Sequence, residues 1–158
     1  MIEAYSERDR EAVVACSLRA WAPVFEGMRA ALPPFLYDAF YPDGWQTRQA
    51  AEVGAFVDEE GEHVLVARQD DVVVGWVGYR MHSEDSMGEI VMIAVEPDRQ
   101  RQGIARQLVE AALARFRDAG MTIAMIETGG DPGHAPARAA YDRLGFELWS
   151  VARFVRPL

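Results

Sequence analysis

Residues 89–105, EIVMIAVEPDRQRQGIA, are the most informative part of the sequence for the fold. Its first seven residues form a largely apolar run of the kind that is typical of a buried β-strand. Pro97 then turns the chain, and the residues that follow show the spacing of one helix face. That face comprises Ala105, Leu108, Val109, Ala112, Leu113 and Phe116, with Gly120 suited to the helix end. A strand, a tight loop and a long helix in succession predict an α/β fold.

The loop between this strand and this helix has the chemistry of an anion site. Amides at a helix start lack acceptors within the helix, Gly103 allows close approach, and Arg101 and Arg106 add positive charge. A pyrophosphate group would suit such a site. The loop is neither GxxxxGK[ST] nor GxGxxG, so the two common nucleotide motifs are excluded. A glycine that merely begins a helix would look the same, and the loop alone leaves both interpretations open.

Hydrophobic periodicity predicts the other elements. We expect helices over residues 6–20, 45–56, 105–116 and 136–144, with Cys16 in the core. We expect strands over residues 63–68, 72–82, 88–95 and 121–128, and one or two closing strands over 146–155. Residues 21–45, rich in aromatic residues and interrupted by prolines, are expected to be irregular and only partly helical.

Composition narrows the function classes. The 158 residues carry a formal net charge of −9, which argues against nucleic acid as a partner. Residues 1–97 hold 7 Arg against 18 acids, whereas residues 98–158 hold 9 Arg against 7 acids, so two ligands of opposite charge are conceivable. Lysine is absent, which excludes a lysine nucleophile. The single cysteine cannot form an internal disulfide, and the scattered histidines do not suggest a metal site. Because no long apolar run is present, we expect no signal peptide and no membrane span, and therefore a cytoplasmic protein.

A second motif, Ala137-x-x-x-Tyr141-x-x-x-Gly145-Phe146, follows the long helix. Together with Gln100, Gly103 and Ala105, which fill the pattern [RQ]-x-x-G-x-[GA], it makes the chain resemble the GNAT superfamily of acetyl-CoA-dependent N-acetyltransferases. The resemblance covers residues 1 to about 156 in element order and 89–146 in motif.

The resemblance implies a single α/β (α+β) domain over residues 1–158. Its mixed, mostly antiparallel sheet would have six to seven strands, flanked by about four helices, with the fourth and fifth strands parallel and splayed. Residues 1–62 would supply the N-terminal helices and the acceptor side, and residues 88–146 the acetyl-CoA-binding core.

The family also implies where acetyl-CoA or coenzyme A would bind, without a metal. The strand would pair with the pantetheine arm through Ile93, Ala94 and Val95. The helix start would hold the diphosphate through Gln100, Arg101, Gln102, Gly103, Ile104, Ala105 and Arg106. His134 stands where the family often has asparagine, and is open to two interpretations, a donor to pantetheine or a plain helix cap.

Acetyl transfer by direct attack through a tetrahedral intermediate needs a base, an oxyanion donor and an acid. Tyr141 matches the residue that protonates the coenzyme A sulfur in the family, and the Val95 amide is the expected oxyanion donor. Glu89 matches the base of the histone acetyltransferases, and strand alternation would put it on the face of Val91, Ile93 and Val95. Glu127 matches the base of the ribosomal-protein branch. His82 is a third candidate.

The acceptor is expected on the acidic, aromatic side of the chain. A cationic, partly apolar amine would suit Trp21, Phe25, Glu26 and Tyr37, although core packing would also explain the aromatic residues. We expect transfer to a primary amine of a small molecule. The alternatives are a protein N-terminal or lysine acetyltransferase and a non-catalytic acyl-CoA-binding domain. A homodimer is plausible from the apolar C-terminal tail, and no membrane partner is expected.

Overall fold

The computed structural model describes residues 1–158 and divides them into two units. Unit 1 comprises Met1–Trp21 and Gln49–Glu127, and unit 2 comprises Ala22–Arg48 and Thr128–Leu158. No helix is long and apolar enough to span a membrane.

A five-stranded sheet is the centre of unit 1. Its strands lie in chain order: β1 (Ile2–Ala4), β2 (Val64–Gln69), β3 (Val72–His82), β4 (Met87–Val95) and β5 (Ile123–Ile126). Neighbours from β1 to β4 are antiparallel, whereas β4 and β5 are parallel. The hairpin, the long strand before the loop and the parallel pair are confirmed.

The expected count of six to seven strands is wrong. Residues 146–155, expected to form one or two closing strands, are not assigned to a strand, and several of their apolar side chains, such as Trp149 and Phe154, are exposed. The three-residue strand β1 was not expected, because so short a segment carries no measurable alternation. It pairs with β2 through Ile2, opposite Ala67.

The structure has five α-helices where about four were expected. They are α1 (Arg10–Ala31), α2 (Pro34–Phe40), α3 (Trp45–Glu59), α4 (Ile104–Asp118) and α5 (Ala135–Arg143). Residues 21–45 are therefore more helical than expected. Pro23 lies inside α1 and lacks the amide proton that would bond to the carbonyl of residue 19, so the helix tolerates one missing hydrogen bond.

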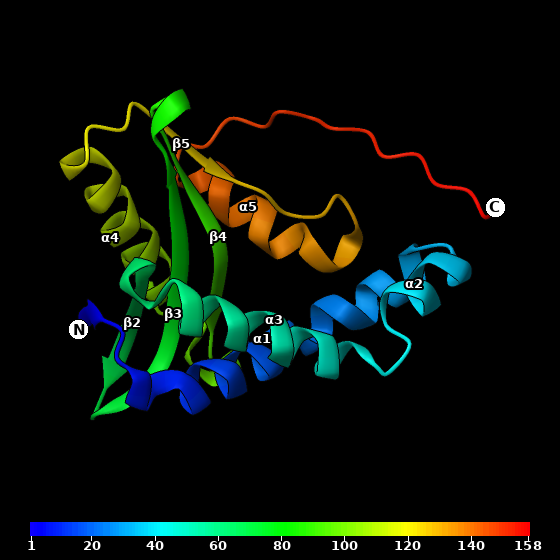
Figure 1. The fold of residues 1–158 in the computed structure, drawn as a ribbon, viewed down its shortest axis with the longest axis horizontal. Helices are drawn as coiled ribbons and strands as arrows, with labels where there is room; N and C mark the ends of the chain where they lie inside the picture. Colours follow the sequence, from blue (N-terminus) through cyan, green and yellow to red (C-terminus); the bar gives the residue numbers. More distant parts are fainter. The chain divides into compact units, whose positions relative to one another are not determined.

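Helices cover both faces of the sheet in unit 1 (Figure 1). The apolar stripe of α4 contacts β2, β3 and β4, with Leu108, Val109 and Ala112 fully buried. On the opposite face of the sheet, a core cluster joins the N-terminal part of α1 and the unit 1 part of α3 to the strands. Its buried members are Val13, Cys16, Val53, Phe56, Val57, Val64, Val66, Val73, Trp76 and Ala94. Cys16 is in the core as predicted.

A bulge in β4 changes which side chains share a face. Gly78 of β3 pairs with Met92, but the next residue, Tyr79, pairs with Ile90, so Val91 is an extra residue without a partner. Glu89 pairs with Arg80 and therefore lies on the face of Met92 and Ala94. The expected face, shared with Val91, Ile93 and Val95, is wrong because strict alternation does not survive the extra residue.

Candidate functional site

The edge of β4 beyond the bulge offers backbone groups that β3 does not use. The Glu96 amide donates to the Val74 carbonyl (2.9 Å), so the opposed pair Gly75 and Val95 is a non-hydrogen-bonded pair of the antiparallel ladder. The amides of Val95 and, two residues back, of Ile93 therefore point away from β3. The side-chain amide of Gln100 donates to the Val95 carbonyl (3.1 Å), which agrees with this direction.

No β5 residue pairs with this part of β4. The parallel ladder joins Met87–Ile90 to Ile123–Ile126 and ends there, because β5 ends at Ile126. The expected splaying of the two strands stays a prediction. The Ile93 and Val95 amides can therefore bind an extended ligand or a developing negative charge. Ala94 differs, because its backbone groups face Trp76 of β3.

The loop after β4 has the backbone of an anion cradle. Arg101 (φ 60°) and Gly103 (φ 83°) both adopt left-handed conformations, and alternation of this kind turns successive amides to one side. Gly103 is the N-cap of α4 and has no side chain to accept from the first amides of the helix. A Cβ at Gly103 would meet nothing within 4 Å, so the space above the glycine is open. These features fit a diphosphate.

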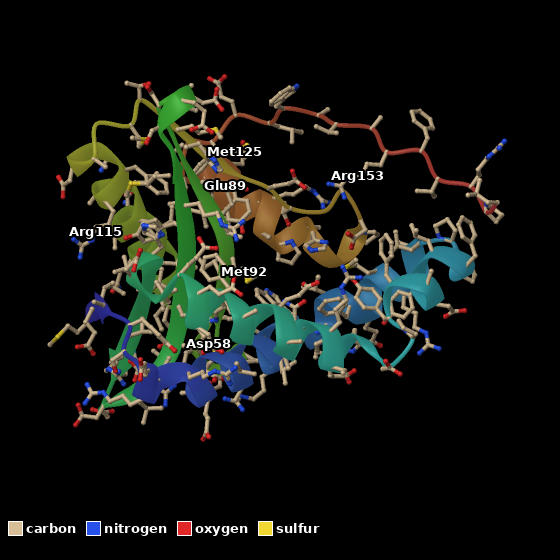
Figure 2. All side chains as sticks on the ribbon, viewed as in Figure 1. Asp58, Glu89, Met92, Arg115, Met125 and Arg153 are labelled. Carbon is tan, nitrogen blue, oxygen red and sulfur yellow. The ribbon has the colours of Figure 1, made fainter.

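Glu89, the first candidate base, has a defined environment. Its Oε2 lies 2.8 Å from His82 Nε2, and the side chains are 23% and 31% exposed, respectively. Figure 2 shows Glu89 beside Met125 at one end of β4, in agreement with the register of β4 and β5, and Met92 further along the strand. Two of the three candidate bases, Glu89 and His82, are thus in direct contact.

Arg80, which the sequence did not single out, stands opposite Glu89 in β3. Its guanidinium donates instead to Glu60, through Nε (3.0 Å to each oxygen) and Nη2 (2.6 Å). These hydrogen bonds hold the pKa of Glu60 below its usual value. The third candidate base, Glu127, directly follows β5 and is exposed.

Tyr141, the candidate acid, lies in α5 of unit 2. Burial raises the pKa of its phenol to about 12, and its ring contacts Phe146 edge-on, with centroids 6.2 Å apart. A phenol of such a pKa keeps its proton at neutral pH. The Tyr141 side chain therefore packs against Phe146, just beyond the end of α5, and also keeps its proton.

His134, a candidate pantetheine donor, belongs to a loop that is held from several sides in unit 2. Its Nδ1 lies 2.5 Å from Asp131 Oδ2, and Asp131 also accepts from the Gly133 amide (2.9 Å). Burial opposes ionisation of Asp131, but these hydrogen bonds outweigh it and lower its pKa. Arg138 donates to the carbonyls of Gly129 and Asp131. His134 is the N-cap residue of α5, as the interpretation of a plain helix cap expects, although its side chain makes no cap hydrogen bond.

The aromatic candidates for the acceptor site are mostly engaged with protein groups. In unit 1, Trp21 lies edge-on to Trp76 (6.4 Å between centroids). In unit 2, Phe25 is buried and stacks on Trp45 (4.4 Å), while Tyr37 lies beneath the Arg29 guanidinium (5.8 Å). Glu26 is exposed. Among the four, the exposed carboxylate of Glu26 is the group best able to meet an amine.

Comparison with known proteins identifies the family of the chain. Residues 30–146 match the acetyltransferase (GNAT) family. A mycothiol acetyltransferase of Rhodococcus opacus is 33% identical over 118 residues, which are 69% of this chain but 38% of the relative. The chain thus spans about two fifths of the length of that relative.

Two solved structures show the same fold at low sequence identity. An aminoglycoside N-acetyltransferase in complex with CoA matches with a TM-score of 0.66 at 17% identity. The match covers 99% of this chain and 93% of the aminoglycoside N-acetyltransferase chain. An N-acetyltransferase of Thermoplasma acidophilum in complex with coenzyme A has a TM-score of 0.69 at 12% identity, covering 96% and 92%. With the family match over most of its length, the chain belongs to the GNAT family of acetyltransferases.

Proposed function

We propose that the protein transfers an acetyl group from acetyl-CoA to a primary amine of a small molecule. The observation that carries this proposal is the pair of unused amides at Ile93 and Val95, followed in the chain by the left-handed turn at Arg101 and Gly103. Together these groups suit an extended arm that ends in a diphosphate. The matches to GNAT proteins support the choice of coenzyme A as that molecule.

Acetyl-CoA would supply an activated thioester carbonyl. In our proposal the amides of Ile93 and Val95 bind the pantetheine arm, and the first amides of α4 with Arg101 and Arg106 bind the diphosphate. The Val95 amide also stabilises the negative charge that develops on the carbonyl oxygen.

The proton transfers need a base and an acid. An alkylammonium is almost fully protonated at pH 7, so Glu89 accepts its proton and the nitrogen lone pair forms the new N–C bond. The C–S bond then breaks, and Tyr141 gives its phenolic proton to the departing thiolate. The nitrogen loses its second proton, which restores the phenol and leaves a neutral amide. Glu127 is the alternative base.

A small-molecule acceptor is favoured by the relatives named mycothiol acetyltransferase. Acidic residues outnumber arginines in residues 1–97, which suits a cationic amine. Transfer to a protein N-terminus or lysine remains the competing function, and binding of acyl-CoA without turnover is the competing non-enzymatic one.

The test is a transfer assay with mass detection of the products. Purified protein is incubated with acetyl-CoA and, separately, with neamine, spermidine, the deacetylated form of mycothiol and a short peptide with a free N-terminus. We expect acetylation of a small amine. Acetylation of the peptide alone would favour the protein-modifying function, and binding of acetyl-CoA without any product would favour the non-catalytic one.

A matched pair of glycine variants tests whether the loop before α4 binds the diphosphate. Gly103→Glu puts a negative side chain at the proposed diphosphate site, whereas Gly120→Glu puts the same side chain at the opposite end of α4. Both glycines have positive φ (83° and 77°) and open space at the Cβ position, so both variants carry similar backbone strain. We expect transfer to be lost only in Gly103→Glu.

A further inference from the structure

The contact between His82 and Glu89 defines which atom carries a proton. An ionised carboxylate can only accept hydrogen bonds, so at 2.8 Å the His82 Nε2–H must donate to Glu89 Oε2. This fixes the tautomer of the imidazole. It also leaves the second carboxylate oxygen, Oε1, as the one that is available to another donor.

No other neighbouring side chain holds the Glu89 carboxylate by a hydrogen bond. Arg80 stands opposite Glu89 in the register, but its hydrogen bonds go to Glu60, and its guanidinium lies 5.3 Å from the centroid of the Phe56 ring. In β5 the register partner of Glu89 is Met125, whose thioether is at most a weak acceptor. The charged and titratable groups around Glu89 are thus His82 and Arg80 from β3, with Glu60 behind Arg80.

The bulge makes a separate restraint on Glu89 useful. Val91 has no partner in β3, so the regular ladder is interrupted two residues after Glu89. A catalytic carboxylate must be held within a fraction of an ångström of its productive position. A hydrogen bond from the neighbouring strand supplies such a restraint at the side chain itself.

We propose that His82 is a positioning residue for Glu89: by donating to Oε2 it fixes the carboxylate and leaves Oε1 to take the proton of the acceptor ammonium. The inference rests on the proposed function, because it assigns a partner to the proposed base. During the step the ammonium proton moves to Oε1 and the nitrogen lone pair forms the N–C bond. The Nε2 proton stays on His82.

A double-mutant cycle tests the inference. His82→Leu removes the donor, and we expect kcat to fall about tenfold while KM for acetyl-CoA stays the same. His82→Gln retains an amide donor at a similar reach and should recover most of the rate. In a Glu89→Gln background, His82→Leu should cost nothing further, because there is no carboxylate to position. A merely structural role would instead give the same loss in both backgrounds.

The outcomes separate this inference from the proposed function. If wild type transfers acetyl and Glu89→Gln is impaired while His82→Leu is fully active, the positioning role is overturned and the base is retained. If Glu89→Gln is as active as wild type, both the base and its positioning residue are overturned. If wild type acetylates none of the amines tested, the proposed function fails first.

A spectroscopic measurement decides the geometry without any acceptor. A long-range ¹H–¹⁵N spectrum of the histidine rings at pH 8 should show His82 with Nε2 protonated in every molecule. In Glu89→Leu the ring should exchange between its two neutral tautomers, as free histidine does. Such exchange in the wild type would overturn the inference, whatever the activity assay shows.

Discussion

Tyr141 offers a prediction in which stability and catalysis separate. Burial raises the pKa of its phenol from 10.0 to about 12. Because the folded state holds the proton more tightly than the unfolded state does, the associated stability is present in full below pH 10. It is lost as the pH rises from 10 to 12, where unfolding releases a proton.

The size of the effect follows from the shift. About two pKa units at about 1.36 kcal/mol each give a loss on the order of 2.7 kcal/mol. Tyr141→Phe has no phenolic proton to lose. Between pH 10 and pH 12, its free energy of unfolding should therefore fall by about 2.7 kcal/mol less than that of the wild type. At pH 8 the two proteins should agree within about 0.5 kcal/mol, because the ring keeps its packing and no hydrogen bond to the phenol is lost.

Urea unfolding at several pH values between 8 and 12 measures the difference. Other groups with raised pKa, such as Tyr5 and Tyr79, are present in both proteins and cancel. Acetyl transfer at pH 8 should fall about a hundredfold or more in Tyr141→Phe if the phenol is the acid. Parallel stability curves would refute the account of its burial, and an unchanged rate would refute its role as the acid.

Three further predictions concern the core and the loop. Ser17→Ala should lower the free energy of unfolding by about 1–3 kcal/mol, because the buried Trp76 indole N–H donates to Ser17 Oγ (2.8 Å) and would lose its acceptor. Urea unfolding measures this loss, and a value below about 0.5 kcal/mol would contradict the prediction. Cys16, with its pKa raised to about 12 by burial and then by Glu96, should resist a thiol reagent at pH 8 in the native protein and react after unfolding. Gly103→Glu should show no rise in Tm with acetyl-CoA, whereas Gly120→Glu should respond as wild type does; equal responses would contradict the role of the loop.

The elements that could be predicted from the sequence are those in which many residues repeat one signal. Helix α4 shows six apolar residues on one face, and the hairpin of β2 and β3 shows two β-rich runs separated by Asp70 and Asp71. Local signals sufficed there, because burial and periodicity agree over several turns or residue pairs. The loop before α4 could also be located, since Gly103 suits a left-handed N-cap.

Features that depend on pairing could not be predicted from the sequence. The bulge at Val91 adds one residue without changing the apolar character of the strand, so alternation assigned the wrong face to Glu89. The contact between Glu89 and His82 depends on the register of β3 and β4, which one sequence does not specify. The apolar residues at 146–155 favour a strand in isolation, but a strand needs a partner to pair with. The contact between Asp131 and His134 could have been predicted, because an acidic residue and a histidine three residues apart often lie side by side in a helical turn.

The central claim is that acetyl-CoA binds along the β4 edge and the start of α4. A ¹H–¹⁵N spectrum of the labelled protein, recorded before and after addition of acetyl-CoA, tests it most directly. The account predicts that in unit 1 the largest shifts fall on the amides of Ile93 and Val95 and of residues 101–106, with Ala94 affected less. A spectrum that does not change at saturating acetyl-CoA, or one whose changes avoid these amides, would contradict it.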